Sequence, residues 1–112
     1  MRIHIGEADD WTPAPSCIAL AASLKASGHD AAITVYPGAY HDFDNPMTSH
    51  LRLPNVDNGA ACSFRVASIL GPFPSTTEIE GCLRKGATVG GNSAAIEQAR
   101  TSVRAQLAEL LR

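Results

Sequence analysis

The chain has 112 residues, of which 45% are hydrophobic and 18% are charged, and its formal net charge is −2. This composition is typical of a folded domain, and the absence of a Lys or Arg run argues against nucleic acid and an anionic membrane surface as partners. The sequence has neither an apolar stretch of the ~20 residues that a membrane-spanning helix needs nor a signal-peptide pattern, so we expect a cytoplasmic location.

A strand, a helix and a second strand are predicted in the first third of the chain. The first strand covers Arg2 to Gly6, Thr12 is placed to cap the helix with Pro13 at its first position, and Gly28 supplies a left-handed stop. The second strand covers Ala31 to Tyr36. A strand, helix and strand in so short a span form a right-handed crossover unit with neighbouring strands. The expected apolar face of the helix consists of Cys17, Leu20, Ala21 and Leu24.

An acidic side chain and an imidazole follow these two strands. Asp9 comes after the first strand and His41 after the second. Because the carboxyl ends of parallel strands meet at one edge of a sheet, a carboxylate oxygen of Asp9 should lie about 2.6–3.2 Å from a His41 ring nitrogen. Acid then histidine is the order of the last two triad members in α/β-hydrolases, whose nucleophile lies earlier on a G-x-[SC]-x-G elbow. This sequence contains no such elbow.

Other interpretations of these polar side chains stay open. Taken singly, Asp9 is typical of a helix cap and His41 of a turn residue, and Asp10 is a second candidate for the acid, although more typical of a solvated side chain or local cap. A divalent metal site is a less favoured alternative, because acids after strands are usually caps and turns; the chemistry we favour needs no metal and no other cofactor. The ligands of such a site are Asp9, Asp10, His41, Asp42 and Asp44.

Aromatic and further histidine side chains surround the expected pair. Trp11 and Tyr40 flank the acid and the base, where each is predicted either to line a substrate pocket or to pack over the neighbouring loop. His4 is interpreted as a satisfied histidine within the sheet, and His29 and His50 as solvent-exposed residues.

Residues 44–91 carry weaker signals. Frequent Pro and Gly residues indicate mainly loop, with one short strand at about Ser63 to Leu70 and an ordered turn near Thr77 to Leu83. The segment Gly86 to Asn92 lacks the spacing of a phosphate-binding loop, so it is interpreted as the turn that leads into the last helix.

The last predicted element is an amphipathic helix with Asn92 or Ser93 as its N-cap. Its apolar stripe should pack on the sheet. The stripe consists of Ile96, Ala99, Val103, Leu107 and Leu110.

The three cysteines are odd in number and form no C-x-x-C pair, which argues against a disulfide framework and a zinc site. Cys17 is interpreted as a core residue of the first helix, and Cys62 and Cys82 as partly buried thiols. None has the flanking glycines of a nucleophile elbow.

Three segments resemble the C-terminal half of the dienelactone hydrolase family with intact spacing: Ile3 to Pro13, Val35 to Asp44 and Cys82 to Asn92. The resemblance spans nearly the whole chain and implies an α/β fold, namely the C-terminal portion of an α/β-hydrolase sheet. Its elements are strand, helix, strand, a long loop with a short strand, and a C-terminal helix, in a single partial domain over residues 1–112. In that family an acid after Gly-x-x orients the histidine of a Tyr-Pro-Gly-x-x-His-x-Phe segment. The resemblance therefore implies that Asp9 is the acid and His41 the general base.

The resemblance also implies hydrolysis of a small ester or lactone through an acyl-enzyme on a Cys or Ser nucleophile. The family's oxyanion loop, several strands and nucleophile elbow should precede residue 1, so the isolated chain is expected to be inactive. The alternative is a non-catalytic, truncated α/β module that acts as an oligomeric or interaction domain.

A missing front half also predicts an incomplete sheet. The strand Arg2 to Gly6 should leave backbone groups unpaired on its far side, and Ile3, Ile5 and Val35 should lack part of their cover. We therefore expect either self-association through this edge or binding of an N-terminal hydrolase fragment.

Overall fold

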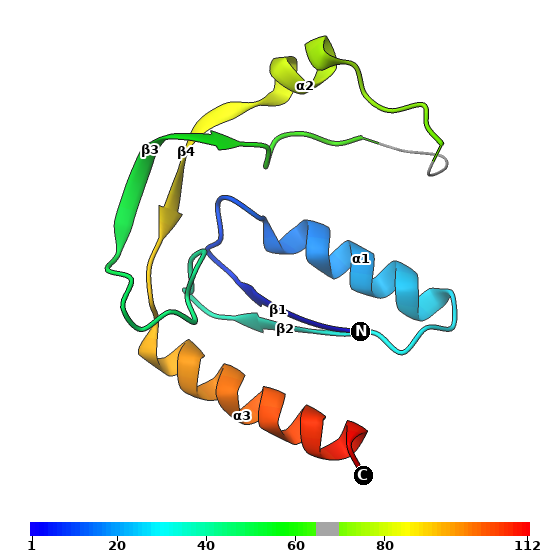
Figure 1. Ribbon diagram of the computed structural model, residues 1–112, viewed down its shortest axis with the longest axis vertical. Coiled ribbons are helices and arrows are strands. Elements are labelled where there is room, and N and C mark those ends of the chain that lie inside the picture. Colours follow the sequence, from blue (N-terminus) through cyan, green and yellow to red (C-terminus); the bar gives the residue numbers. More distant parts are fainter. Residues whose placement is uncertain (65–69) are drawn as a thin grey trace.

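The computed structural model describes residues 1–64 and 70–112, and it begins with a strand, a helix and a strand (Figure 1). Strands β1 (Arg2–Gly6) and β2 (Ala32–Tyr36) are parallel neighbours joined by helix α1 (Ala14–Ala26). In their register Arg2 lies opposite Ala32 and Gly6 opposite Tyr36, so both strands end at the same edge of the pair. The crossover unit predicted from the sequence is confirmed.

The start of α1 differs from the prediction. The expected cap at Thr12 is wrong, because Pro13 occupies the N-cap position, without a side-chain hydrogen bond, and the helix begins at Ala14. The helix stop is confirmed, since Gly28 has a φ of +81°. Leu20 was expected on the buried face but is 48% exposed, whereas Ala14 and Ala21 are buried against the strands. Small residues fit this face because α1 lies close to both strands.

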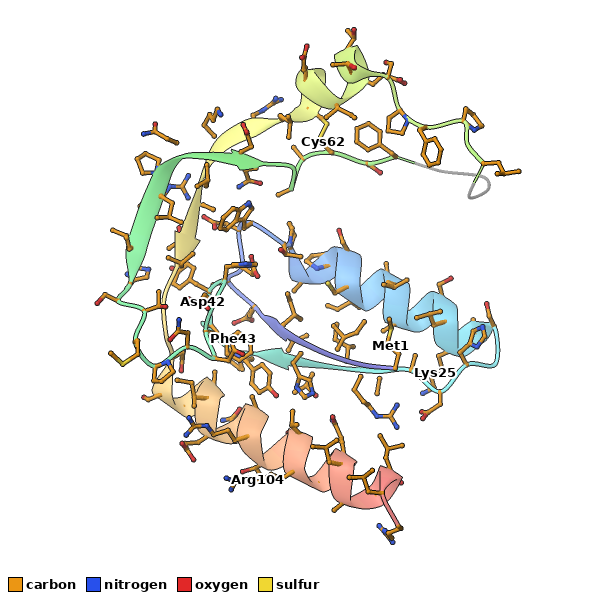
Figure 2. The ribbon with its side chains drawn as sticks, viewed as in Figure 1. Met1, Lys25, Asp42, Phe43, Cys62 and Arg104 are labelled. Atoms are coloured by element: carbon orange, nitrogen blue, oxygen red, sulfur yellow. A yellow bond between two sulfur atoms is a disulfide. The ribbon has the colours of Figure 1, made fainter. Side chains whose placement is uncertain are left out.

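Helix α3 (Ser93–Leu110) covers the other face of the strand pair, so that β1 and β2 lie between α1 and α3 (Figure 1). Its predicted cap is confirmed, because Oδ1 of Asn92 accepts the N–H of Ala95 at 3.0 Å. A buried core forms where this helix meets the end of β2, and Figure 2 shows Phe43 at that junction. The core consists of Tyr36, Ala39, Phe43, Ala95 and Ala99.

Only the first half of α3 packs as expected. Ile96 and Ala99 are buried, but Val103, Leu107 and Leu110 are 39%, 49% and 67% exposed. The apolar stripe therefore continues past the short strand pair into solvent.

In the described part of the chain, no helix combines the length and apolar character needed to cross a bilayer.

The prediction of mainly loop over residues 44–91 missed two strands, although about half of the described residues in this range lie outside helices and strands. Strands β3 (Leu51–Asn58) and β4 (Arg84–Val89) form a second, antiparallel pair, so that β4 replaces most of the turn expected at Gly86 to Asn92. Pro54 indicated a loop, yet it lies in β3 where the register shifts between Leu53 and Asp57, an irregularity that accommodates a residue without an N–H.

Helix α2 (Thr76–Cys82) stands where an ordered turn was expected. Ser75 begins it with a capping box, in which its hydroxyl accepts the N–H of Glu78 and the Glu78 carboxylate accepts the N–H of Ser75. The strand expected at Ser63 to Leu70 lies largely outside the described residues.

Cys62 and Cys82 form a disulfide, which corrects the expectation of two free thiols. Their Cα atoms are 5.0 Å apart, and the bond joins the segment after β3 to the end of α2, as seen beside the labelled Cys62 in Figure 2. Cys17 on α1 is free. Three cysteines can form at most one disulfide within the chain, and the sequence does not show which two cysteines are joined. The structure shows this pairing.

The described chain is open in shape. Its radius of gyration is 16.2 Å, whereas a compact domain of this length has about 13 Å. Figure 1 shows the reason, because the β3, β4 and α2 arm extends away from the layered α1, strand pair and α3. Among the described residues β1 pairs with β2 alone, as expected, and Ile3 and Val35 are half-buried. The expectation of exposure is wrong for Ile5, which is 8% exposed.

Candidate functional site

Asp9 and His41 meet at the carboxyl ends of β1 and β2. They lie on the acid loop (residues 7–13) and the base loop (residues 37–43), and Oδ2 of Asp9 is 3.0 Å from Nδ1 of His41. This confirms the distance predicted from the sequence. The Asp9 side chain is 3% exposed and that of His41 is 39% exposed. An ionised Asp9 places the ring proton on Nδ1, so Nε2 keeps a lone pair that can accept a proton.

The second oxygen of Asp9 closes the acid loop. Oδ1 accepts the N–H of Trp11 at 2.9 Å and of Thr12 at 2.7 Å. Asp9 therefore also closes a local turn, but it is not the cap of α1 that was the alternative interpretation of this residue, because Pro13 occupies the N-cap position. Three donors compensate the burial of its charge, and they hold the carboxylate in one orientation toward His41.

Gly6 lets the acid and base loops approach each other. The N–H of Ala8 donates to the carbonyl of Ala39 at 2.9 Å, so the two backbones are in direct contact beside residue 6. A Cβ on Gly6 would overlap the Ala39 carbonyl and lie 2.9 Å from the Tyr40 carbonyl oxygen. Only glycine fits this position without separating the loops that carry Asp9 and His41.

We expect Gly6→Ala to lower the free energy of unfolding by about 3 kcal/mol, because backbone atoms cannot move aside as a flexible side chain would. Urea denaturation measures the change. Gly81→Ala is the matched control, since a Cβ there meets nothing within 4 Å and alanine favours helix α2. Equal stability of the Gly6 and Gly81 variants would show that the two loops are not in close contact.

The base loop turns sharply after the histidine. Asp42 has a φ of +62°, a left-handed conformation that Asp tolerates better than most residues. Its carboxylate accepts hydrogen bonds from Asn45 Nδ2 and the hydroxyl of Thr48, which offset the strain. This turn sends the chain back toward β4, where the His41 carbonyl accepts the N–H of Gly90 at 3.0 Å.

The side chain of Asp10 is 39% exposed, as expected of a partly solvated side chain, but the expectation of a local cap is wrong because its partners lie far along the chain. Its carboxylate accepts the N–H of Thr88 at 2.7 Å, the Thr88 hydroxyl at 2.9 Å and Nη1 of Arg52 at 2.7 Å. Burial opposes its ionisation, but the Thr88 hydrogen bonds and the Arg52 charge outweigh burial and lower the pKa of Asp10 below its ordinary value of 3.8. Asp10 is therefore an anion at neutral pH and contacts β3 and β4 rather than His41.

The alternative of a metal site gains no support from the geometry. In the described ranges, no group of three or more His, Cys, Asp and Glu side chains is placed to hold a metal ion. Asp10 is engaged by Thr88 and Arg52, and Asp42 by Asn45 and Thr48.

Trp11 lies against His41 and Tyr40 does not. The Trp11 and His41 ring centroids are 5.0 Å apart at 52°, and the indole N–H donates to the Asp57 carbonyl at 3.0 Å. Tyr40 instead packs on exposed His50, with centroids 4.7 Å apart.

The other two histidines behave as expected. His4 is paired as predicted for a sheet histidine: its Nδ1 is 2.7 Å from the hydroxyl of Tyr36, and its Nε2 is 3.3 Å from Oε1 of Gln106. His29 is exposed to solvent.

A cavity of about 440 Å³ opens beside the pair, between β1, the base loop and α3. Nε2 of His41 has no hydrogen-bond partner among the described residues, and His41 lines this cavity. Most of the residues that line this cavity were not predicted from the sequence. The apolar spacing of the last helix, which includes Ala99 and Val103, was a signal that could have pointed to two of them. The lining residues are His4, Ile5, Asp9, Thr12, His41, Asp42, Phe43, Asp44, Ala99 and Val103.

Comparison with known proteins matches the chain to a family model. The family model described as the dienelactone hydrolase family matches residues 1–68. The matched range contains β1, α1, β2, both loops and β3. No curated protein and no solved structure matches the chain.

Proposed function

The chain belongs to the dienelactone hydrolase family, and we propose that it supplies the acid and the general base of a Cys/Ser-His-Asp triad that hydrolyses an ester or lactone. The observation that carries this proposal is the 3.0 Å contact between Oδ2 of Asp9 and Nδ1 of His41. The acid is buried, the base lines a cavity, and both follow parallel strands, where open α/β sheets place their functional groups.

In the proposed reaction His41 Nε2 removes the proton from a Cys thiol or Ser hydroxyl as that atom attacks the substrate carbonyl carbon. The imidazolium, stabilised by the Asp9 carboxylate, then gives the proton to the leaving alkoxide and an acyl-enzyme remains. Water, deprotonated by the same His41 nitrogen, attacks the acyl carbon. The imidazolium then returns this proton to the departing thiolate or alkoxide, which releases the acid and regenerates the free nucleophile and the neutral histidine. In a lactone the acid and the alcohol stay in one molecule.

The nucleophile in this proposal comes from a polypeptide segment outside this chain. The sequence has no G-x-[SC]-x-G elbow. Cys62 and Cys82 are joined to each other, and Cys17 on α1 is not among the residues that line the cavity. We infer that residues 1–112 form one partial domain, with β1 and β2 as the C-terminal portion of an α/β-hydrolase sheet.

The free edge of β1 is the proposed contact for the completing segment. Helices cover both faces of the β1 and β2 pair, which is typical of interior strands of a parallel sheet, yet β1 has one strand partner in the described chain. We expect the isolated chain to self-associate through this edge or to bind an N-terminal hydrolase fragment. Sedimentation over a range of concentrations measures it, and a cooperatively folding monomer at every concentration would contradict it.

We expect the isolated chain to hydrolyse p-nitrophenyl acetate no faster than its His41→Ala variant, because it provides neither an elbow nucleophile nor oxyanion donors. A His41-dependent rate that a Cys17→Ala substitution abolishes would show that the chain contains its own nucleophile. Mixing with an N-terminal fragment of a dienelactone hydrolase that carries the elbow should produce His41-dependent turnover. A fragment complex that forms without such turnover would overturn the proposed function.

A second candidate function is a non-catalytic oligomeric or interaction module. Its supporting observation is the exposed second half of the α3 stripe, which includes Leu107 and Leu110.

The cytoplasmic location stays a prediction. The Cys62–Cys82 disulfide bears against it, because disulfides are rare in the cytosol.

A further inference from the structure

The end of β4 contacts both loops that carry the proposed acid and base. On one side, the N–H and hydroxyl of Thr88 donate to Asp10 of the acid loop. On the other side, Val89 forms a parallel bridge with His41, and the N–H of Gly90 donates to the His41 carbonyl. Thr88, Val89 and Gly90, at the end of β4, therefore contact both the acid loop and the base loop and hold them in place relative to each other.

Asp10 is held at its backbone as well as at its carboxylate. Asn58, which is 8% exposed, donates through Nδ2 to the carbonyl of Asp10 at 2.9 Å and to the carbonyl of Gly86 at 2.7 Å. Its own Oδ1 accepts the N–H of Ala60. A buried amide with these partners fixes the peptide between Asp10 and Trp11 relative to β3 and β4.

The neighbours of Asp10 are the two acid-loop residues that contact the His41 ring. Asp9 binds its Nδ1 atom, and Trp11 packs on the ring while its indole N–H donates to the Asp57 carbonyl of β3. Because residues 9, 10 and 11 are consecutive in the backbone, we expect a shift of residue 10 to displace both contacts to the imidazole.

We propose that Asp10 is a positioning residue, which couples the acid loop to the end of β4 and thereby sets the approach of Asp9 and Trp11 to His41. The inference rests on the proposed function of the Asp9 and His41 pair, and Asp10 acts through these neighbours without touching a substrate. The ionised state of Asp10 suits this role, since a carboxylate accepts all three donors from Thr88 and Arg52 at once.

The test measures which nitrogen of the neutral His41 ring carries the proton, by ¹⁵N NMR of the full chain. Wild type should show the Nδ1–H form, and Asp10→Ala should convert a large part of it to the Nε2–H form as the Asp9 contact loosens. The emission of Trp11, the only tryptophan, should shift to longer wavelength as its ring becomes solvated. Asp30→Asn is the matched control, because it removes an acid that pairs with Arg2 away from the site.

Thr88→Val keeps the test decisive if Asp10→Ala does not fold, because it removes one of the hydrogen bonds to Asp10 and retains the backbone donor. It should shift the tautomer in the same direction and by less. An unchanged tautomer and Trp11 emission in a folded Asp10→Ala or Thr88→Val chain would overturn the proposal.

These readouts need no nucleophile, so they separate this inference from the proposed function. In the completed enzyme Asp10→Ala should lower kcat by about ten- to a hundredfold with little change in KM, the size expected for misplaced catalytic groups. Tautomer shifts without turnover in any complex would leave the positioning role standing and contradict the hydrolase proposal.

Discussion

Replacing Asp9 by Asn will lower the hydrolytic rate of the completed triad by about 10⁴-fold, the cost measured for the same change in a serine protease. The amide cannot hold the His41 proton on Nδ1 as the carboxylate does at 3.0 Å, so the ring presents its N–H rather than a lone pair to the nucleophile. The measurement is kcat/KM for an activated ester, with the chain bound to an N-terminal fragment that carries the elbow.

Asp30→Asn again provides the control for the loss of one acidic charge, since Asp30 pairs with Arg2. It should leave kcat/KM within about twofold, because an exposed ion pair contributes little. Rates that fall equally in the two variants would mean that Asp9 has no specific role as the triad acid.

Tyr36→Ala will reduce the free energy of unfolding by about 3–5 kcal/mol, the usual cost of emptying a large buried site. Tyr36 is 1% exposed, and its ring lies 4.9 Å from that of Phe43 at the core beneath the base loop. Denaturant titration at fixed protein concentration gives the difference.

Tyr36→Phe separates packing from hydrogen bonding in this core. It keeps the ring and loses only the hydroxyl, which lies 2.7 Å from Nδ1 of His4, so we expect a loss of about 1 kcal/mol. A Tyr36→Ala variant as stable as Tyr36→Phe would contradict the packing of α3 on the strand pair.

Local sequence signals were sufficient for the crossover unit and for the Asp9 and His41 contact. Alternating apolar runs, the glycine at residue 28 and the order of strand ends specify β1, α1 and β2, and parallel strands then bring their following loops together. The cap at Asn92 and the helical spacing of the apolar residues after it were likewise sufficient to predict α3. Which half of the apolar stripe of α3 is buried depends on the length of β1 and β2, the strands that the helix covers.

Long-range contacts account for what the sequence did not reveal. β3 contains Pro54, a residue that usually interrupts strands, and it is stabilised by pairing with β4, which lies about 30 residues later in the chain. The local sequence around Pro54 therefore indicated a loop. In the sequence Asp10 looks like an ordinary acidic loop residue, because the Thr88 backbone N–H that donates to its carboxylate lies 78 residues later in the chain. The Cys62 and Cys82 pairing depends in the same way on the position of α2.

The most direct measurement of the central claim is to find which polypeptide carries the acyl group during turnover. The complex of this chain with an elbow-bearing N-terminal fragment is mixed with an activated ester, quenched in acid and analysed by mass spectrometry. We expect the added acyl mass on the fragment alone, and no acyl-enzyme when His41 is replaced by Ala. A His41-dependent acyl group on Cys17, or on any other residue of this chain, would contradict the account.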